Sequence, residues 1–473
     1  MSEIQYICLS DMHLGASNSL LTPLRPSISG ETKNENLIAP LETSPILKET
    51  IETLKFIVRN NNRKIKPKLI LNGDLLELAL ANTNEAGMVF ERLLEQLFPQ
   101  GEKAVFDSEL IFIPGNHDHH LWETAREAQY LNYVSQLKEK YLPEPWHTTK
   151  MFNPDPVPSL FLKGLINRNA SLKNKVSVNV VYPNLGILDT EGKKCVVFSH
   201  GHYVESLYSL MTTLKTMIIP DREKPRHIWD IEAENFAWID FFWSTLGRSG
   251  EVGKDVESIY NKIQVPEKFD ELLRQFSKSF SGKVTDKVFM QWLIKTALDY
   301  ILPKTVGTIA RRERGDTSNV LSEDARCGLK CYIEELLPLQ MKRELKDKPI
   351  PEQVTFIFGH THKPFQELQA YRGFKKAIHI FNSGGWVVDT IKEEPFRGAA
   401  AILVDDNLDT VSLRLYNEQD YRTRVEAPSQ HPFFYQIDNL VKSEQHKFEE
   451  LTRLIWGEVK NRIGVLEEEI DQT

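Results

Sequence analysis

Five short apolar runs recur along the chain, and a polar motif follows each of them. The runs occupy residues 6–10, 68–72, 109–114, 194–199 and 355–359. Continuous apolar runs of this length, with many β-branched residues, are typical of buried strands. Helical periodicity alternates with the first of these runs, over about 45–60, 85–98 and 119–141. The alternation predicts a layered α/β (α+β) core.

Further apolar runs and a long charged segment follow the last motif. The runs AIHIFN, GAAAILVD and TVSLRLYN predict strands of a second sheet that closes the core. The segment from about His431 to Thr473 predicts one long helix, for which packing on the core is the default expectation.

A long insertion separates the fourth motif from the fifth, and its pattern is mostly helical. Because it leaves the core beside one motif and returns just before the next, we expect a helical cap rooted beside the motifs. It is rich in aromatic residues at Phe236, Trp238, Phe241, Phe242 and Trp243. They suit a surface for an acyl chain or a membrane interface. Packing inside the cap or against the core is the commoner role of aromatic side chains.

The length of the chain agrees with this division, since 473 residues exceed one typical domain. We predict a discontinuous core at 1–202 and 353–430, the helical cap at 203–352 and a C-terminal helix at 431–473.

The motifs after the five runs contain the residues of a metal site. In chain order they are Asp11-Met12-His13, Gly73-Asp74, Gly115-Asn116-His117-Asp118, His200-Gly201-His202 and Gly359-His360-Thr361-His362. In a layered α/β domain the carboxyl ends of neighbouring strands open into one crevice, where ligands bind. Carboxylates, imidazoles and one carboxamide therefore meet in a single place, which predicts a two-metal site.

The residue types indicate the metal and the reaction. Imidazole and carboxylate suit Mn²⁺, Fe²⁺, Zn²⁺ or Co²⁺, of which we expect Mn²⁺ first, and no motif offers a thiolate. Two such ions with Asp11, Asp74 and one hydroxide would keep a small positive charge that suits a phosphate group. Two ions can also clamp the attacking and leaving oxygens of an in-line displacement. The predicted reaction is hydrolysis of a phosphate ester.

The ordered motif set resembles the calcineurin-like metallophosphoesterase superfamily, whose pattern is DxH, GD, GNH(D/E), a GH-type histidine and GHxH. The likeness spans roughly residues 4–390, although only the strand–motif segments match. It implies a two-sheet β-sandwich flanked by helices. It also implies a hydrolase with a dinuclear metal centre, which cleaves a phosphate ester or pyrophosphate bond by in-line attack of a metal-bridging hydroxide.

The resemblance further implies a role for each motif residue. One metal ion would be held by Asp11, His13 and His362, the other by Asn116, His200 and His360, with Asp74 bridging. His117 would contact the phosphoryl oxygen and help the leaving group, as electrostatic stabiliser or general acid. Asp118 would orient that imidazole. In relatives with an HGH string the first histidine is the ligand, which favours His200 over His202.

The closest local likeness is to the UDP-diacylglucosamine pyrophosphatase-like branch. The strings SDMHLG, GDLLEL, GNHD, HGH and GHTHKP all resemble that branch. The pyrophosphatase proper tends to carry Arg where His117 stands, and the present insertion is far longer. From this resemblance we therefore infer the reaction class of the protein but not a lipid substrate. The protein serine/threonine phosphatase branch is less similar, because the arginine of its GDxVDRG string has no counterpart here.

The net charge of the chain indicates which kind of substrate it binds. A nuclease usually needs a basic track for the phosphate backbone, whereas the net charge here is −8 and the basic clusters are local. These clusters are Arg63, Lys64, Lys66 and Lys68, and Arg311, Arg312 and Arg314. We expect a phosphorylated small molecule, a nucleotide or a lipid-linked substrate. A nuclease acting on DNA or RNA stays as an alternative, and so does a binding or scaffold protein with structural metals.

Other features concern location and the remaining histidines. With no secretory signal, no long apolar run and four cysteines, the simplest expectation is a cytoplasmic protein with reduced thiols and no transmembrane segment. Peripheral membrane contact through the cap stays open. For His119 and His120, which directly follow the third motif, we expect hydrogen-bonded core residues and not ligands; lining the rim of the pocket or facing solvent on a first helical turn are the alternatives.

Overall fold

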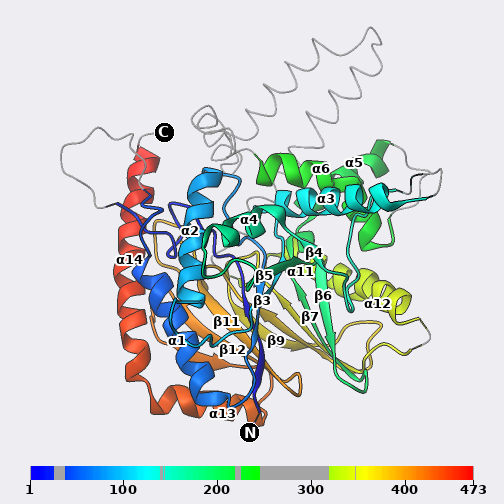
Figure 1. The fold of residues 1–473 in the computed structure, drawn as a ribbon. Coiled ribbons are helices and arrows are strands. Elements are labelled where there is room, and N and C mark those ends of the chain that lie inside the picture. The colour runs from blue at the N-terminus through cyan, green and yellow to red at the C-terminus, as the bar shows by residue number, and fades with distance from the viewer. Residues whose placement is uncertain are drawn as a thin grey trace.

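Two β-sheets form the centre of the structure, a computed structural model that describes residues 2–25, 38–138, 142, 144–218, 225–245, 319–346 and 348–471 (Figure 1). The larger sheet has the strand order β13-β12-β11-β1-β2-β3-β5-β4 and the smaller sheet the order β6-β7-β8-β10-β9. The strands of the larger sheet are β1 (Ile4–Leu9), β2 (Lys68–Asn72), β3 (Glu109–Ile113), β4 (Val157–Pro158), β5 (Ser177–Val180), β11 (Gly398–Asp405), β12 (Thr410–Asn417) and β13 (Arg424–Glu426). Those of the smaller sheet are β6 (Asn184–Leu188), β7 (Lys194–Ser199), β8 (Gln353–Phe358), β9 (Phe365–Gln369) and β10 (Ile378–Asn382).

The strands that precede the motifs are parallel neighbours within each sheet. β1 pairs with β2 so that Leu9 is opposite Leu71, and β2 pairs with β3 so that Asn72 is opposite Ile113. In the smaller sheet β7 and β8 are also parallel. The first three motifs therefore leave one edge of the larger sheet, and the last two leave an edge of the smaller sheet.

A buried apolar layer joins the two sheets. Its side chains come from strands of both, and include Cys8, Ile70, Ile113, Ile402, Val196, Phe198, Ile357 and Phe381. The predicted two-sheet sandwich flanked by helices is confirmed.

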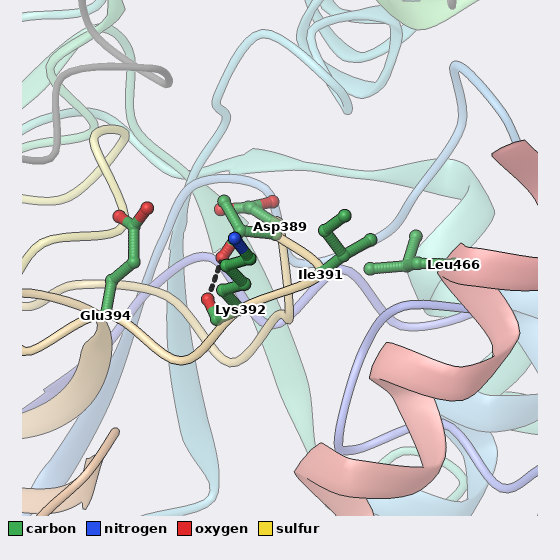
Figure 2. Close-up of a pocket in the computed structure, with 6 residues that line it drawn as sticks. Asp389, Ile391, Lys392, Glu394 and Leu466 are labelled. Atoms are coloured by element: carbon green, nitrogen blue, oxygen red, sulfur yellow. Dashed lines mark hydrogen bonds between the residues drawn. The ribbon is translucent and has the colours of Figure 1, made fainter.

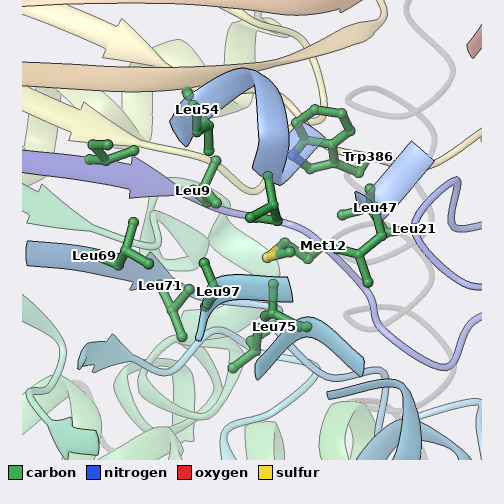
Figure 3. Close-up of a cluster of buried hydrophobic side chains, with 14 of the residues drawn as sticks. Leu9, Met12, Leu21, Leu47, Leu54, Leu69, Leu71, Leu75, Leu97 and Trp386 are labelled. Atoms are coloured by element: carbon green, nitrogen blue, oxygen red, sulfur yellow. The ribbon is translucent and has the colours of Figure 1, made fainter. Parts of the chain in front are cut away.

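Helices cover the other face of the larger sheet. They are α1 (Pro45–Asn61), α2 (Thr83–Leu97), α4 (Leu160–Arg168), α13 (Pro432–Ser443) and α14 (His446–Asp471). The helix α1 begins where Ser44 accepts the N–H of Leu47 and a proline occupies the first turn, as helix starts favour. Figure 3 shows leucines of α1 and α2 facing leucines of β1 and β2. The helices predicted from the sequence at 45–60 and 85–98 are confirmed.

The insertion contributes helices beside the smaller sheet and beside α3 (His120–Gln136). It begins with the short turns η1 (His202–Val204) and η2 (Ser206–Ser209), followed by α5 (Leu210–Ile218) and α6 (Ile228–Ser244). It returns to the core through α11 (Glu323–Cys331), the π-helical turn η5 (Tyr332–Leu336) and α12 (Leu337–Leu345), which pack on the smaller sheet. The part of the predicted helical cap at residues 246–318 lies outside the described residues.

Two expectations about the last part of the chain are wrong. Of the three late strands, only β10 belongs to the smaller sheet, because β11 pairs with β1 and β12 pairs with β11. The C-terminal segment forms two helices, α13 and α14, where one was expected. As expected, it packs on the core, through buried residues such as Phe433, Leu451 and Ile455. Among the described helices, none is long and apolar enough to cross a bilayer.

Candidate metal centre

The predicted ligands meet at the ends of strands from both sheets. Asp11, His13 and His362 form one buried group, and Asp74, His200 and His360 form another, with the donor atoms of each group within 4.8 Å of one another. Oδ2 of Asp74 links the groups, 3.3 Å from Nε2 of His200 and 3.7 Å from Nε2 of His13. The carboxamide oxygen of Asn116 lies 3.1 Å from Nε2 of His200. All seven predicted ligands are thus brought together.

The backbone is strained at this place. Five of the seven predicted ligands have a positive φ, namely Asp11 (49°), His13 (43°), Asp74 (47°), His360 (69°) and His362 (57°). Such a conformation costs roughly 1–3 kcal/mol for a residue other than glycine, and it concentrates at functional sites. The strain points to a site that is built for function.

Two imidazole nitrogens face each other at the centre. Nε2 of His13 lies 3.2 Å from Nε2 of His362. The Nδ1 atoms of the two rings contact the carboxylates of Glu77 at 2.9 Å and Asp389 at 2.7 Å, so in each neutral ring the proton belongs on Nδ1. Two bare Nε2 acceptors would then oppose each other, and a divalent cation bound to both would satisfy them. The donor set therefore fits a metal ion.

The carboxylates of the centre are held as anions. Burial alone would raise the pKa of Asp74 and of Asp11, but neighbouring imidazoles, above all that of His200, lower both. Burial acts to lower the pKa of His200, yet Asp74 and Asp11 raise it to about 9. Buried carboxylates among imidazoles are suited to cations.

Glycine is needed at Gly73, where the second motif passes His200. Its φ is +86°, and a Cβ atom added there would lie 2.2 Å from Nδ1 of His200. The carbonyl oxygen of Gly73 accepts the N–H of Asp11 at 2.9 Å. The residue therefore joins three motifs by a close approach that a side chain would block.

We expect Gly73→Ala to abolish metal binding, because the added methyl group must displace the His200 ring. Gly101→Ala is the matched control, since Gly101 has a φ of +85° but no atom within 4 Å of the added Cβ. Both substitutions carry the backbone cost of about 1–2 kcal/mol, and only the first disturbs the centre. Metal content after loading with Mn²⁺ is the measurement. Equal metal content in the two variants would contradict the expectation.

Glu77 is a candidate functional residue that the sequence analysis missed. Its buried carboxylate contacts Nδ1 of His13 through Oε2 and Nδ1 of His117 through Oε1, both at 2.9 Å. Burial would raise the pKa of Glu77, but the two imidazoles hold it far below its ordinary value. The available signal was a glutamate inside the apolar run LLELAL, because a buried carboxylate needs partners.

The carboxylate of Asp118 binds backbone N–H groups of the second and third motifs. Its carboxylate accepts the backbone N–H groups of Gly115 and Leu75, each at 2.7 Å, and of Leu76 at 3.2 Å. The carboxylate on Nδ1 of His117 is that of Glu77. Asp118 folds back on its own turn, as Asp side chains often do, and so fixes the backbone of the third motif against the second.

Asp389 lies behind His362 and adjoins a cavity. Its Oδ2 contacts Nδ1 of His362 at 2.7 Å and Nη1 of Arg397 at 2.9 Å. The cavity of about 450 Å³ is lined by Asp389, Thr390, Ile391, Lys392, Glu394 and Leu466 (Figure 2). Asp389 supports the ligand ring from this side.

The insertion begins in contact with the predicted ligands. Oε1 of Glu205 lies 2.8 Å from Nε2 of His360. The ring of Tyr208 is 5.0 Å from that of His360 and 5.4 Å from that of Trp243. The described start of the insertion is therefore rooted beside the metal centre, as expected for a cap.

Most of the predicted cap aromatics pack inside the protein. Trp243 is buried, the indole N–H of Trp238 donates to the carbonyl of Leu207 at 3.0 Å, and Phe236 lies 5.1 Å from the Arg126 guanidinium. Phe241 is 62% exposed, and the side chain of Phe242 lies outside the described residues. Packing inside the protein, the commoner role of aromatic side chains, is therefore the role of Phe236, Trp238 and Trp243.

The histidines after the third motif form hydrogen bonds inside the protein, as expected. His119 is completely buried and His120 is partly buried. Both contact carboxylates of α6, His119 that of Glu232 at 2.8 Å and His120 that of Asp240 at 3.0 Å. The second histidine of the fourth motif, His202, contacts the hydroxyl of Tyr182 at 3.1 Å. His200, by contrast, contacts the predicted ligands.

A comparison with protein families agrees with this geometry. The family model described as calcineurin-like phosphoesterase matches residues 4–301. The match contains the first four motifs, and the fifth lies beyond its end. No curated protein matches the chain.

Proposed function

Because the chain belongs to the calcineurin-like phosphoesterase family, we propose that it hydrolyses a phosphate ester or pyrophosphate bond with two divalent metal ions. The family supports metal-dependent phosphoester hydrolysis, and the number of ions and the substrate class are our proposal. The observation that carries it is the meeting of two buried groups of histidine and aspartate, one around Asp11 and one around Asp74.

Each ion has its own set of residues in this proposal. One would be held by Asp11, His13 and His362, the other by Asn116, His200 and His360, and Asp74 would be shared. Mixed nitrogen and oxygen donors favour Mn²⁺, with Fe, Zn or Co as alternatives. When bound, such ions lower the pKa of a bound water and neutralise charge on phosphoryl oxygens.

His117 would provide the proton chemistry. Glu77 holds its Nδ1 at 2.9 Å, so Nε2 is the nitrogen that would hydrogen-bond a phosphoryl or leaving-group oxygen and donate a proton to it. The backbone N–H of His117 donates to Oδ1 of Asp74 at 2.8 Å. This bond fixes the imidazole relative to the carboxylate that the two ions would share.

We propose a phosphorylated small molecule, a nucleotide or a lipid-linked phosphate as the substrate. The insertion supports this choice, because Glu205 and Tyr208 crowd the centre beside His360. Nucleic acid is less favoured. The net charge is −8, and Lys68 of the first basic cluster is paired with Glu109. The second basic cluster, at Arg311, Arg312 and Arg314, lies outside the described residues.

Removal and return of the metal tests the proposal. Metal-stripped protein should be inactive on chromogenic phosphate monoesters and diesters and should regain activity on one of them with Mn²⁺. The preferred ester would narrow the substrate class. Binding should also raise the thermal midpoint, since a metal at about 100 times its Kd adds about 2.7 kcal/mol of stability. Activity that survives stripping, or Mn²⁺ that changes neither activity nor midpoint, would refute the proposal.

A further inference from the structure

A second cluster of buried titratable groups lies where α6 of the cap meets the core. We call it the Glu232 cluster, and its members are His119, Tyr182, His202, Tyr203 and Glu232. The carboxylate of Glu232 on α6 is completely buried. It accepts Nε2–H of His119 at 2.8 Å and the hydroxyl groups of Tyr182, at 2.9 Å, and Tyr203. One cap residue thus satisfies three donors of other elements.

The hydrogen bonds of the cluster have a defined direction. Since the hydroxyl of Tyr182 donates to Glu232, its oxygen accepts from Nε2 of His202 at 3.1 Å. Burial alone would lower the pKa of His119, but the carboxylates of Glu232 and Asp240 raise it to about 10. His119 is therefore a cation at neutral pH, and Glu232 is its counter-charge.

The two completely or largely buried carboxylates beside His119 have cationic partners in the protein itself. Glu123 also lies within ligand distance of His119 and Glu232. However, Glu123 is occupied by Arg126, which donates Nε–H to it at 2.8 Å and a second N–H from Nη2. Glu232 and Glu123 each therefore have a cationic partner, His119 and Arg126. The cluster is an anchor between cap and core.

The anchored core residues lie next to two motifs of the metal centre. His119 follows His117 by two residues, and His202 follows His200 by two, with 5.7 Å between the rings of the last pair. The same helix also accepts the backbone N–H of His120 at 2.8 Å through Oγ of Ser244. Figure 1 shows α6 beside α3, which starts at His120. Helix α6 of the cap is thus hydrogen-bonded to residues next to the third motif and, through Tyr182, next to the fourth.

We propose that Glu232 is a positioning residue that couples the seating of the cap to the geometry of the metal centre. The inference rests on the proposed function. Through His119 it fixes the turn of Asn116 and His117, and through Tyr182 it fixes the turn of His200. Without the negative charge of Glu232, the buried His119 cation lacks a counter-ion. The three hydrogen-bond donors around residue 232 then compete for a weaker acceptor. Both turns would then shift, and a displacement of about 1 Å can lower a rate about 100-fold.

The test compares Glu232→Gln with Glu234→Gln in the Mn²⁺-loaded full chain. Glu234 lies on the same helix, but its carboxylate contacts Thr212 at 2.8 Å and Lys215, both within the cap. We expect Glu232→Gln to lower kcat per bound metal by about 10- to 100-fold, with KM nearly unchanged. Glu234→Gln should match the wild type. Reduced kcat with unchanged KM separates positioning from loosening of the cap, which would also alter KM.

Two further variants keep the inference testable if Glu232→Gln is unstable. Glu232→Asp retains the charge and should keep more activity than Glu232→Gln. In Glu232→Gln with His119→Gln, the unpaired cation is removed, so the double variant should be no worse than Glu232→Gln. Equal kcat in Glu232→Gln and Glu234→Gln, or a double variant with strictly additive losses, would overturn the inference. An inactive wild type would instead refute the proposed function.

Discussion

Asp74→Asn is expected to lower kcat by on the order of 10³-fold or more and to release metal from the centre. Oδ2 of Asp74 lies within 3.7 Å of ligand nitrogens in both groups, those of His200 and His13. The amide nitrogen that replaces one carboxylate oxygen is a donor and cannot bind a cation. The lost negative charge also weakens attraction for both ions.

The fold should survive this substitution. Asparagine has the shape of aspartate. Its carbonyl oxygen can still accept the backbone N–H of His117, which in the wild type lies 2.8 Å from Oδ1 of Asp74. The measurements are kcat and bound Mn²⁺, with the thermal midpoint of the metal-free protein as a check on folding. Asp155→Asn is the control, because the Asp155 side chain is 81% exposed and pairs with Lys150 on the surface. Full activity with full metal content would refute the role of Asp74 as a shared ligand.

The sequence predicts the positions of the candidate ligands because they lie within short motifs directly after strands. Leu9, Asn72 and Ser199 end strands β1, β2 and β7, and the polar residues follow within four positions. Parallel pairing aligns such ends within one sheet. The proximity of strand end and motif, both local features of the chain, makes this part of the site predictable.

The allocation of strands to sheets is not local. The runs that form β10 and β11 are both short and apolar, yet one joins β8 and the other joins β1. The pattern of a strand indicates how deeply it is buried. Which strand it pairs with depends on which sheet edge is still unpaired where the chain comes back to the core. For this reason the sequence predicts the wrong sheet for β11 and β12.

The residues that support the ligands were missed for a related reason. These residues contact imidazoles that are distant from them in the sequence, and they are Glu77, Glu205 and Asp389. No spacing rule connects residue 77 with residue 13, or residue 389 with residue 362. Only the burial of a carboxylate within an apolar run, as at Glu77, could have indicated a partner. For Asp118, adjacency to His117 predicted an orienting role, whereas the hydrogen bonds of its carboxylate go to the backbone of Gly115, Leu75 and Leu76.

His117→Gln is expected to lower kcat by about 10²- to 10⁴-fold, the usual contribution of a general acid or base, without loss of metal. Its Nδ1 contacts Glu77, and its ring is 4.8 Å from that of His13. These three residues form a further buried group beside those around Asp11 and Asp74, and Glu77 occupies the Nδ1 atoms of both of its imidazoles. Glutamine retains a hydrogen-bonding group but cannot deliver a proton. Asp74→Asn should lose metal and activity together, whereas His117→Gln should lose activity alone.

The separation of these two losses decides between an enzyme and a binding protein. His446→Gln is the control, because the His446 side chain is 63% exposed on α14. We expect that control to match the wild type in kcat and in bound Mn²⁺. An ester with a good leaving group should suffer less from His117→Gln than one with a poor leaving group, because it needs less protonation as it departs. Equal loss on both esters would assign His117 to electrostatic stabilisation of the phosphoryl oxygens. Full retention of activity in His117→Gln would remove the residue from the chemistry, whereas a wild type that binds Mn²⁺ but hydrolyses neither ester would favour a protein whose metals are structural.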